Sequence, residues 1–301
     1  MQKFLVVITG PTGIGKTSVG IEVARHFHTE IISSDSRQIY RELSIGTAVP
    51  SNKELKEVPH HFIHSHSIND DYNASRYEHE ALEILDTLFR KHTIVLLVGG
   101  SMLYVDAVCK GIDSMPDADP EIRESLKKQL SNEGLESLRR QLKKLDPAYY
   151  ETVDLKNPNR IIHALEITLQ TGKPYSSFRK QKSKERAFQI IKIGLNSDRD
   201  NLHQRINQRV DKMIEAGLIE EARHVYDKKH LNSLNTVGYR ELFSWFDGEI
   251  TKEKATELIK RNSRRYARKQ LTWFRRDPEV EWFEPGQTEQ IIEYISEKMK
   301  E

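Results

Sequence analysis

The 301-residue sequence contains a single cysteine, Cys109. One thiol excludes an intramolecular disulfide and any zinc site built from several cysteines, which is typical of a protein in a reducing compartment, and we expect the cytoplasm. Long apolar runs are also missing, because no stretch approaches the ~20 residues of a membrane-spanning helix. The short apolar start lacks the organisation of a signal peptide. We therefore predict no membrane association.

A strong charge of either sign is absent as well. The chain has 47 Lys and Arg against 45 Asp and Glu, a formal net charge of +2 at pH 7. This total indicates no particular partner, so any nucleic-acid surface must come from local clustering of basic residues. The length is sufficient for a sizeable core and predicts one large domain with an insertion, or two domains.

The most informative stretch lies near the start, where an apolar run at residues 4–9 leads into GPTGIGKT at residues 10–17. The pattern on either side predicts a strand, a loop and a helix. In the phosphate-loop pattern GxxxxGK[ST], backbone N–H groups and a helix N-terminus surround an anion, the lysine adds charge and the hydroxyl can hold Mg²⁺. The sequence therefore predicts a di- or triphosphate site. Its residues are Gly10, Thr12, Gly13, Ile14, Gly15, Lys16 and Thr17, with Thr17 as the metal ligand.

Further strands are predicted at residues 30–34 and 93–98, with a helix at 73–91 between them. This alternation predicts an α/β fold with a parallel sheet flanked by helices. Asp35 follows the first of these strands, where open α/β sheets bind their ligands, and is a candidate functional residue. The other strand is followed by Gly-Gly-Ser101 and lacks the acidic residue that nucleotide hydrolases use for Mg²⁺ and water. We interpret the site as one that holds phosphates without hydrolysing them.

The long stretch at residues 44–72 has no clear periodicity, and we interpret it as a functional loop. It contains four histidines, at positions 60, 61, 64 and 66. Packing or substrate contact is the favoured interpretation for them. Metal binding is the alternative, but no carboxylate lies at a recognisable ligand spacing.

A break at residues 113–120 begins a purely helical pattern that lasts until a strand at 188–195. We predict a helical insertion domain at residues 116–186 within a catalytic core formed by 1–115 and 187–301. The predicted helices of the insertion are 121–131, 135–145, 147–153 and 159–170. The rest of the core is predicted to form helices at 199–216, 219–228 and 252–274, a strand at 280–283 and a closing helix to 299.

Basic residues gather in two stretches. Residues 258–276 contain many lysines and arginines, no acidic residue and the aromatic side chains of Tyr266, Trp273 and Phe274. A second basic group lies in the predicted insertion, between 160 and 186. Such residues beside aromatics favour single-stranded or loop RNA, with a solvated helix face as the alternative. Separately, Arg205 and Arg209 lie four residues apart, so one helical face can direct both at a diphosphate.

Eight segments together carry a resemblance over nearly the whole chain. They are GPTGIGKT, SSDSRQIYRELSIGTAVP, PHHFI, VGGSMLY, NRIIHALEI, RINQRVDKMIEAGL, TVGYREL and RRYARKQLTWFRR. In content, order and spacing the sequence resembles the tRNA dimethylallyltransferases, or tRNA isopentenyltransferases. The resemblance implies a P-loop kinase-like sheet, an all-helical insertion that binds the tRNA anticodon arm, and Mg²⁺ as cofactor. The implied reaction moves a dimethylallyl group from dimethylallyl diphosphate to N6 of the adenine 3′ to the anticodon, at position 37, and releases diphosphate.

The resemblance also implies roles for single residues. Asp35 is the implied general base, with Ser101 and Arg209 completing the catalytic set and Arg205 joining the phosphate loop on the diphosphate. The implied tRNA contacts are Asp35, Ser36, Arg37, Gln38, Ser101, Arg123, Asn159, Arg160, His163, Arg264 and Arg268. The family usually has threonine at Ser101 and often arginine at His163, so an RNA contact at His163 is expected to be weaker or pH-dependent. No protein partner is implied, and we expect a monomer.

Three alternatives remain at this point. The chain could prenylate free adenine nucleotides, phosphorylate a small molecule, or bind RNA without chemistry. The Gly-Gly-Ser strand end argues against a kinase, and a mononucleotide acceptor needs neither the insertion nor the basic stretch at 258–276.

Overall fold

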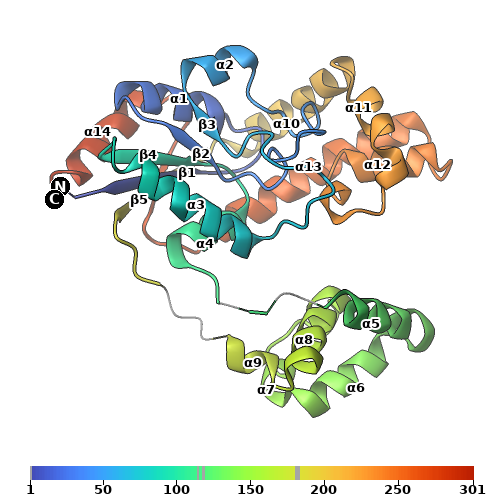
Figure 1. Cartoon of the computed structure of the whole chain (residues 1–301). Coiled ribbons are helices and arrows are strands. Elements are labelled where there is room, and N and C mark those ends of the chain that lie inside the picture. Colours follow the sequence, from blue (N-terminus) through green and yellow to red (C-terminus); the bar gives the residue numbers. More distant parts are fainter. Residues whose placement is uncertain (1, 114, 117–118, 180–183) are drawn as a thin grey trace. The chain divides into compact units, whose positions relative to one another are not determined.

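The computed structural model describes residues 2–113, 115–116, 119–179 and 184–301, and it divides into two compact units (Figure 1). The core unit comprises Met1–Cys109 and Glu185–Glu301, and the insertion unit comprises Lys110–Lys184. The predicted division at residues 116 and 186 differs from these limits by a few residues at each end. Among the described residues, no helix has the length and apolar character needed to cross a membrane.

The core unit is built on a parallel sheet with six strands in its described part, in the order β3-β2-β4-β1-β5-β6. The strands are β1 (Phe4–Thr9), β2 (Ile31–Ser33), β3 (His60–His61), β4 (Ile94–Val98), β5 (Gln189–Leu195) and β6 (Val280–Phe283). β1 lies at the centre, with Val6 opposite Leu96 on β4 and Ile191 on β5. β1 and β4 are buried along their whole length, as expected for a parallel sheet covered on both faces. The predicted α/β fold is confirmed.

Alternate residues of β1 enter two separate hydrophobic clusters. Leu5 and Val7 pack in the cluster that contains buried side chains of α3 (Ala74–Leu88) and α4 (Met102–Lys110). Val6 and the β1 residues two positions before and after it pack in the cluster that contains buried side chains of α1 (Lys16–His26) and α14 (Thr288–Lys298). These two pairs of helices lie on opposite faces of the sheet in Figure 1. Because successive side chains of a strand point to opposite faces of the sheet, β1 packs against a layer of helices on each face.

Further core helices gather beyond the carboxyl ends of the strands (Figure 1). They are α10 (Arg199–Glu215), α11 (Leu218–His224), α12 (Tyr239–Phe246) and α13 (Lys252–Phe274), with short 3₁₀ turns at Tyr226–Lys228 and Asn232–Leu234. The sequence pattern predicts α10, α11 and α13 but neither α4 nor α12. It also indicates an irregular stretch at residues 44–72, whereas this stretch contains α2 (Asn52–Glu57) and β3. β3 has two residues, which are too few for the alternating pattern of a strand to appear in the sequence.

The insertion unit has its own hydrophobic core, formed by buried side chains such as Leu126, Leu142 and Leu165. Its helices are α5 (Pro120–Glu133), α6 (Leu135–Leu145), α7 (Pro147–Tyr150), α8 (Pro158–Thr171) and α9 (Tyr175–Phe178). Three of them begin with proline after an Asp or Asn whose side chain accepts hydrogen bonds from backbone N–H groups of the first turn. This is a strong helix-start signal, and it agrees with three of the helices that the sequence pattern predicts in this unit.

Candidate active site

The phosphate loop connects β1 to α1, and its first residue has to be glycine. Gly10 has φ of 146°, and a Cβ there would lie 2.5 Å from the carbonyl oxygen of Leu195 on β5. Within the loop the side chain of Ile14 is fully buried, so only its backbone is available to a ligand. Gly13, Gly15 and Thr17 remain partly exposed. The loop thus has the strand, turn and helix context that its motif requires.

Lys16 points back over its own loop. Its Nζ donates to the carbonyl oxygens of Gly10, at 3.0 Å, and Pro11, at 2.9 Å. The pKa of Lys16 is lowered to about 7, chiefly by burial and also by the positive charge of Arg209, while Asp35 opposes the shift. An anion in the loop would restore the protonated form, because a nearby opposite charge favours the charged state of an amine.

α10 brings its two arginines to the same loop. Arg205 donates from Nε to the carbonyl oxygen of Gly13 at 3.1 Å. Arg209, one turn further along, is largely buried, and this burial lowers the pKa of its guanidinium while Asp35 opposes the shift. Arginine stays charged at physiological pH nonetheless. The positive charges of α10 and of Lys16 therefore lie together beside the phosphate loop.

The tips of the neighbouring strands β2 and β4 place Asp35 and Ser101 side by side. The Asp35 carboxylate accepts from the backbone N–H groups of Arg37, at 2.9 Å, and Gln38, at 3.3 Å. Ser101 Oγ accepts from the Ser36 N–H at 2.8 Å and donates to the Ser36 hydroxyl at 3.1 Å. A tight turn after β2 is thus tied to the end of β4, which fixes the direction of the Asp35 side chain.

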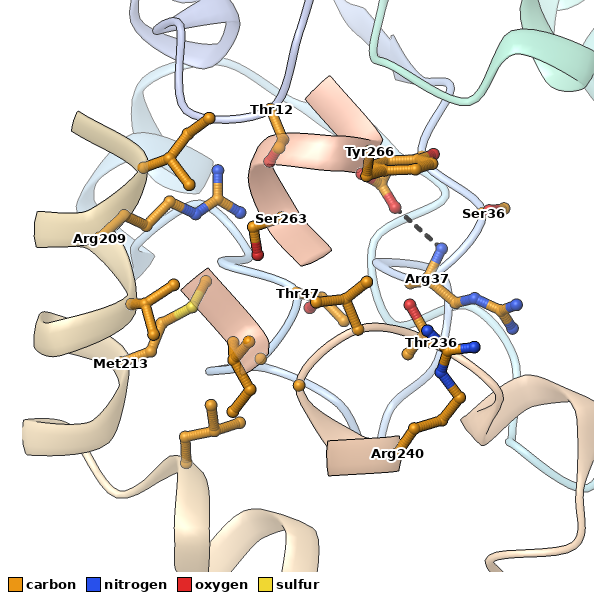
Figure 2. Close-up of a pocket in the computed structure, with 18 of the residues that line it drawn as sticks. Thr12, Ser36, Arg37, Thr47, Arg209, Met213, Thr236, Arg240, Ser263 and Tyr266 are labelled. Atoms are coloured by element: carbon orange, nitrogen blue, oxygen red, sulfur yellow. Dashed lines mark hydrogen bonds between the residues drawn. The ribbon is translucent and has the colours of Figure 1, made fainter. Parts of the chain in front are cut away.

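These residues open into one cavity of about 300 Å³, shown in Figure 2. Asp35, Ser101 and Arg209, predicted as the catalytic set, all line it, together with Thr12 of the phosphate loop. Further lining side chains are Ser36, Arg37, Thr47, Thr236, Arg240, Ser263 and Tyr266, and the apolar Ile206, Val210, Met213, Leu218 and Ile259. The cavity therefore combines a carboxylate, hydroxyls and arginines with an apolar wall.

A second cavity of about 860 Å³ shares Arg209 and Met213 with the first. Gly13 and Arg205, both predicted to bind diphosphate, line only this second cavity. Asp35 and Ser101 line only the first. Arg209 thus borders both cavities, and the phosphate loop contributes Thr12 to the first and Gly13 to the second.

Comparison with known proteins identifies the family. The sequence model described as IPP transferase matches residues 38–277. The chain is 55% identical to tRNA dimethylallyltransferase 1 of Bacteroides fragilis, over 99% of both chains. Its structure resembles the full-length tRNA isopentenylpyrophosphate transferase of Bacillus halodurans, with a TM-score of 0.73 and 36% identity over 100% of this chain and 97% of that one. A eukaryotic dimethylallyltransferase acting on tRNA gives a TM-score of 0.75 and 26% identity, over 90% of this chain and 69% of that one.

The chain belongs to the IPP transferase family. The resemblance seen in the eight sequence segments is therefore confirmed, and with it the assignment of the chain as a transferase.

Part of the cavity wall in this IPP transferase went unnoticed in the sequence. Thr236 and Arg240 belong to the segment TVGYREL, which carried the resemblance but had received no role. Tyr266 was noted only as an aromatic residue within the basic stretch. Burial, with a contribution from Asp35, raises the pKa of its hydroxyl to about 12. Tyr266 therefore enters the cavity as a neutral hydrogen-bonding group.

Two of the predicted tRNA contacts are engaged with the protein's own backbone. Arg37 donates from Nη1 to the carbonyl oxygens of Asn232, at 3.2 Å, and Ser233, at 2.8 Å. Gln38 donates from Nε2 to the backbone carbonyls of residues 47 and 48 at 3.2 and 3.1 Å. Both side chains thus help to shape the cavity, and their contact with RNA stays a prediction.

The arginines of α13 gather on one helix face. They line a cavity of about 700 Å³ with the start of α10, and among the described residues no carboxylate lines it. Its arginines are Arg199, Arg261, Arg264, Arg265, Arg268 and Arg275. Arg264 donates to the Asn207 side chain at 2.5 Å, whereas Arg268 is exposed. Ser263 and Tyr266 of the same helix line the cavity with Asp35.

The predicted tRNA contacts of the insertion unit lie on α5 and α8. Arg123 forms a bidentate ion pair with the fully buried Glu166, both bonds at 2.7 Å, and His163 Nδ1 donates to the same carboxylate at 2.6 Å. Burial alone would raise the pKa of Glu166, but the hydrogen bonds from His163 and Arg123 outweigh it and lower the pKa. Asn159 and Arg160 are exposed in the first turn of α8.

The histidines of residues 44–72 make hydrogen bonds within the protein. His61 contacts Glu30 at 2.7 Å, and His64 contacts the Ser44 hydroxyl at 3.1 Å. The described part of the chain holds no group of three or more His, Cys, Asp and Glu side chains that could bind a metal ion. Both histidines thus take part in the packing of the fold, and since His64 also lines the second cavity, its contact with substrate stays a prediction.

Proposed function

We propose that the protein transfers a dimethylallyl group from dimethylallyl diphosphate to N6 of adenine 37, 3′ to the anticodon of tRNA, and releases diphosphate. The observation that carries this proposal is the cavity in which Asp35, Ser101 and Arg209 meet the phosphate loop at Thr12. A carboxylate, positive charges and an apolar wall in one cavity suit an allylic diphosphate donor and an amine acceptor.

The phosphate loop would hold the donor's diphosphate. Lys16, Arg205 and Arg209 would neutralise the leaving group, which carries more negative charge as the allylic bond breaks. The partly exposed Thr17 at the start of α1 would hold Mg²⁺ through its hydroxyl, with the donor's phosphate supplying further ligands, because Mg²⁺ binds few protein ligands in phosphate sites. When bound, it would add positive charge to the departing diphosphate.

Asp35 would act as the general base for the adenine amine. In the proposed step a bond forms between N6 and the allylic carbon, the bond from that carbon to the diphosphate oxygen breaks, and the amine proton moves to Asp35. The two backbone N–H groups bonded to the carboxylate hold it in place for this role. Ser101 steadies the neighbouring Ser36 turn and is available to the substrate from the same cavity.

The basic residues would bind the anticodon arm. The target adenine lies in a stacked loop, so it has to leave the stack to reach Asp35. We assign RNA contacts to Ser36, Arg37 and Gln38 at the cavity and to Arg264 and Arg268 on α13. In the insertion unit we assign them to Arg123, Asn159, Arg160 and His163. The sequence further favours a cytoplasmic monomer.

The test combines purified protein, dimethylallyl diphosphate, Mg²⁺ and an unmodified tRNA with adenine 3′ to the anticodon. We expect mass spectrometry to find one dimethylallyl group on that adenine. A tRNA with another base at this position is the matched control and should gain no mass. Failure to modify the adenine-containing tRNA would refute the proposal, and equal activity on free AMP would favour a nucleotide prenyltransferase instead.

A further inference from the structure

One buried side chain connects α13 to the phosphate loop. Gln270 is 2% exposed, and both ends of its amide are bonded to backbone groups. Its Oε1 accepts from the N–H of Thr12 at 2.8 Å, and its Nε2 donates to the carbonyl oxygen of Gly100 at 2.8 Å. A single amide therefore bridges the loop after β1 and the end of β4.

The end of β4 is shaped to admit this amide. A Cβ added at Gly100 would lie 2.4 Å from Gln270 Nε2, while its next neighbours, Gly10 O and Lys16 Nζ, would both be 3.4 Å away. The Gln270 amide is thus the single serious obstacle to a side chain at this position. The sequence shows only that the Gly-Gly-Ser strand end lacks the acidic residue of nucleotide hydrolases, and this contact gives a structural reason for the glycine at position 100.

The phosphate loop is held from two directions at its first residues. Lys16 binds the carbonyl oxygens of Gly10 and Pro11, and Gln270 binds the N–H of the next residue, Thr12. Lys16 is also the group expected to turn toward a bound diphosphate. Gln270 then remains as the side chain that keeps this part of the loop in its binding conformation.

We propose that Gln270 is a positioning residue that pre-organises the phosphate loop for the diphosphate of the donor. This inference rests on the proposed function for the identity of the donor, while the loop's affinity for inorganic diphosphate can be measured without it. Because Gln270 shares α13 with Ser263 and Tyr266 of the cavity and with Arg268 of the basic face, the same helix fixes the donor site and borders the acceptor side.

The first experiment measures the affinity of inorganic diphosphate with Mg²⁺ by calorimetry, in the full chain and without RNA. Gln270→Met keeps the length and volume of the side chain but removes both hydrogen bonds. We expect it to weaken diphosphate binding about tenfold, the scale of two lost hydrogen bonds. Trp273→Phe is the matched control, since it removes a hydrogen bond from α13 to Asp106 that does not involve the phosphate loop. It should change the affinity less than twofold.

The second experiment separates positioning from general packing. Gly100→Ala should also weaken diphosphate binding about tenfold, because the new methyl group displaces the Gln270 amide. In a Gln270→Ala background the same Gly100→Ala change should have little further effect. Equal effects of Gly100→Ala in both backgrounds, or unchanged diphosphate affinity in a folded Gln270→Met protein, would overturn the inference. A parent protein that binds diphosphate but modifies no tRNA would instead refute the proposed function alone.

Discussion

Replacing Asp35 by asparagine tests the proposed general base with little structural disturbance. The Asp35 Oδ1 accepts from the N–H groups of Arg37 and Gln38, and an asparagine carbonyl oxygen can accept both bonds. The turn after β2 should therefore survive, as should the contact between Ser101 and Ser36 at its other side. What is lost is the negative charge and the ability to take a proton from the adenine amine.

We expect the rate of transfer in single turnovers to fall by about 10²-fold or more, the scale of a lost general base. The assay follows labelled dimethylallyl diphosphate into tRNA under saturating substrate, with tRNA and diphosphate affinities measured separately. The assay should be run near pH 6.5. The pKa of Lys16 is about 7 and the charge of Asp35 raises it, so a pH below 7 limits the loss of the Lys16 charge in the variant. Both affinities should stay within about threefold of the parent, which corresponds to less than 1 kcal/mol.

Asp70→Asn is the matched control, because Asp70 also accepts from a backbone N–H, that of Ser67, but lies outside the cavity. Its transfer rate should equal that of the parent. A single-turnover rate of Asp35→Asn within threefold of the parent would remove Asp35 from the proton transfer. A large loss of diphosphate affinity with an unchanged rate at saturation would assign Asp35 to binding instead.

Three further predictions concern the phosphate loop and the two basic regions. Gly10→Ala should abolish diphosphate binding and lower the melting temperature, because the added Cβ meets Leu195 O at 2.5 Å, and calorimetry and thermal unfolding check this. Arg268→Ala should weaken tRNA binding and reduce the slope of log K against log salt by up to about 0.9, the value for one phosphate contact; an unchanged slope would make Arg268 a solvated residue. In the insertion unit, Glu166 has a lowered pKa, so its stabilisation is present above the unfolded pKa near 4.5 and is lost as the pH falls through its folded value. Glu166→Gln should therefore cost about 1–3 kcal/mol at pH 7 and less at pH 4 in denaturant titrations, and an equal cost at both pH values would contradict the ion pair's role.

The Glu166 cluster also affects how the predicted RNA contacts can be tested. Removing Arg123 would leave the fully buried Glu166 carboxylate hydrogen-bonded to His163 but without its guanidinium partner, and breaking such a pair costs several kcal/mol. A loss of tRNA binding in Arg123→Ala would thus mix structure with recognition. Arg160 is exposed in the same unit and gives the cleaner variant.

The sequence predicted the parts of the site that follow from local pattern. Glycine spacing, an apolar strand and a following helix define the phosphate loop, and a polar residue directly after a strand identified Asp35. Parallel strands then bring the ends of β2 and β4 together, which is why Asp35 and Ser101 meet without any further assumption. Each of these signals, the phosphate loop motif and the polar residue after a strand, lies within one short segment of the chain.

The rest of the cavity depends on contacts between distant segments. Glu221 on α11 accepts from the backbone N–H groups of Ser44, Ile45 and Gly46, each at 2.8 Å, and from the Tyr239 hydroxyl at 2.6 Å. This carboxylate positions the loop that carries Thr47 into the cavity. No local pattern in residues 44–72 specifies a partner on α11, so the sequence indicated only an irregular loop.

The basic face of α13 shows why a net charge of +2 does not argue against RNA binding. Arginines line the cavity on this face, and among the described residues no carboxylate does, while the balancing acidic residues lie elsewhere. At physiological ionic strength charges more than about 8 Å apart are largely screened, so a phosphate near this face responds to the local arginines rather than to the total. The same helix turns Tyr266 toward Asp35 and Gln270 toward the phosphate loop. α13 therefore connects the proposed tRNA-phosphate contact on its basic face with the proposed donor site at the phosphate loop.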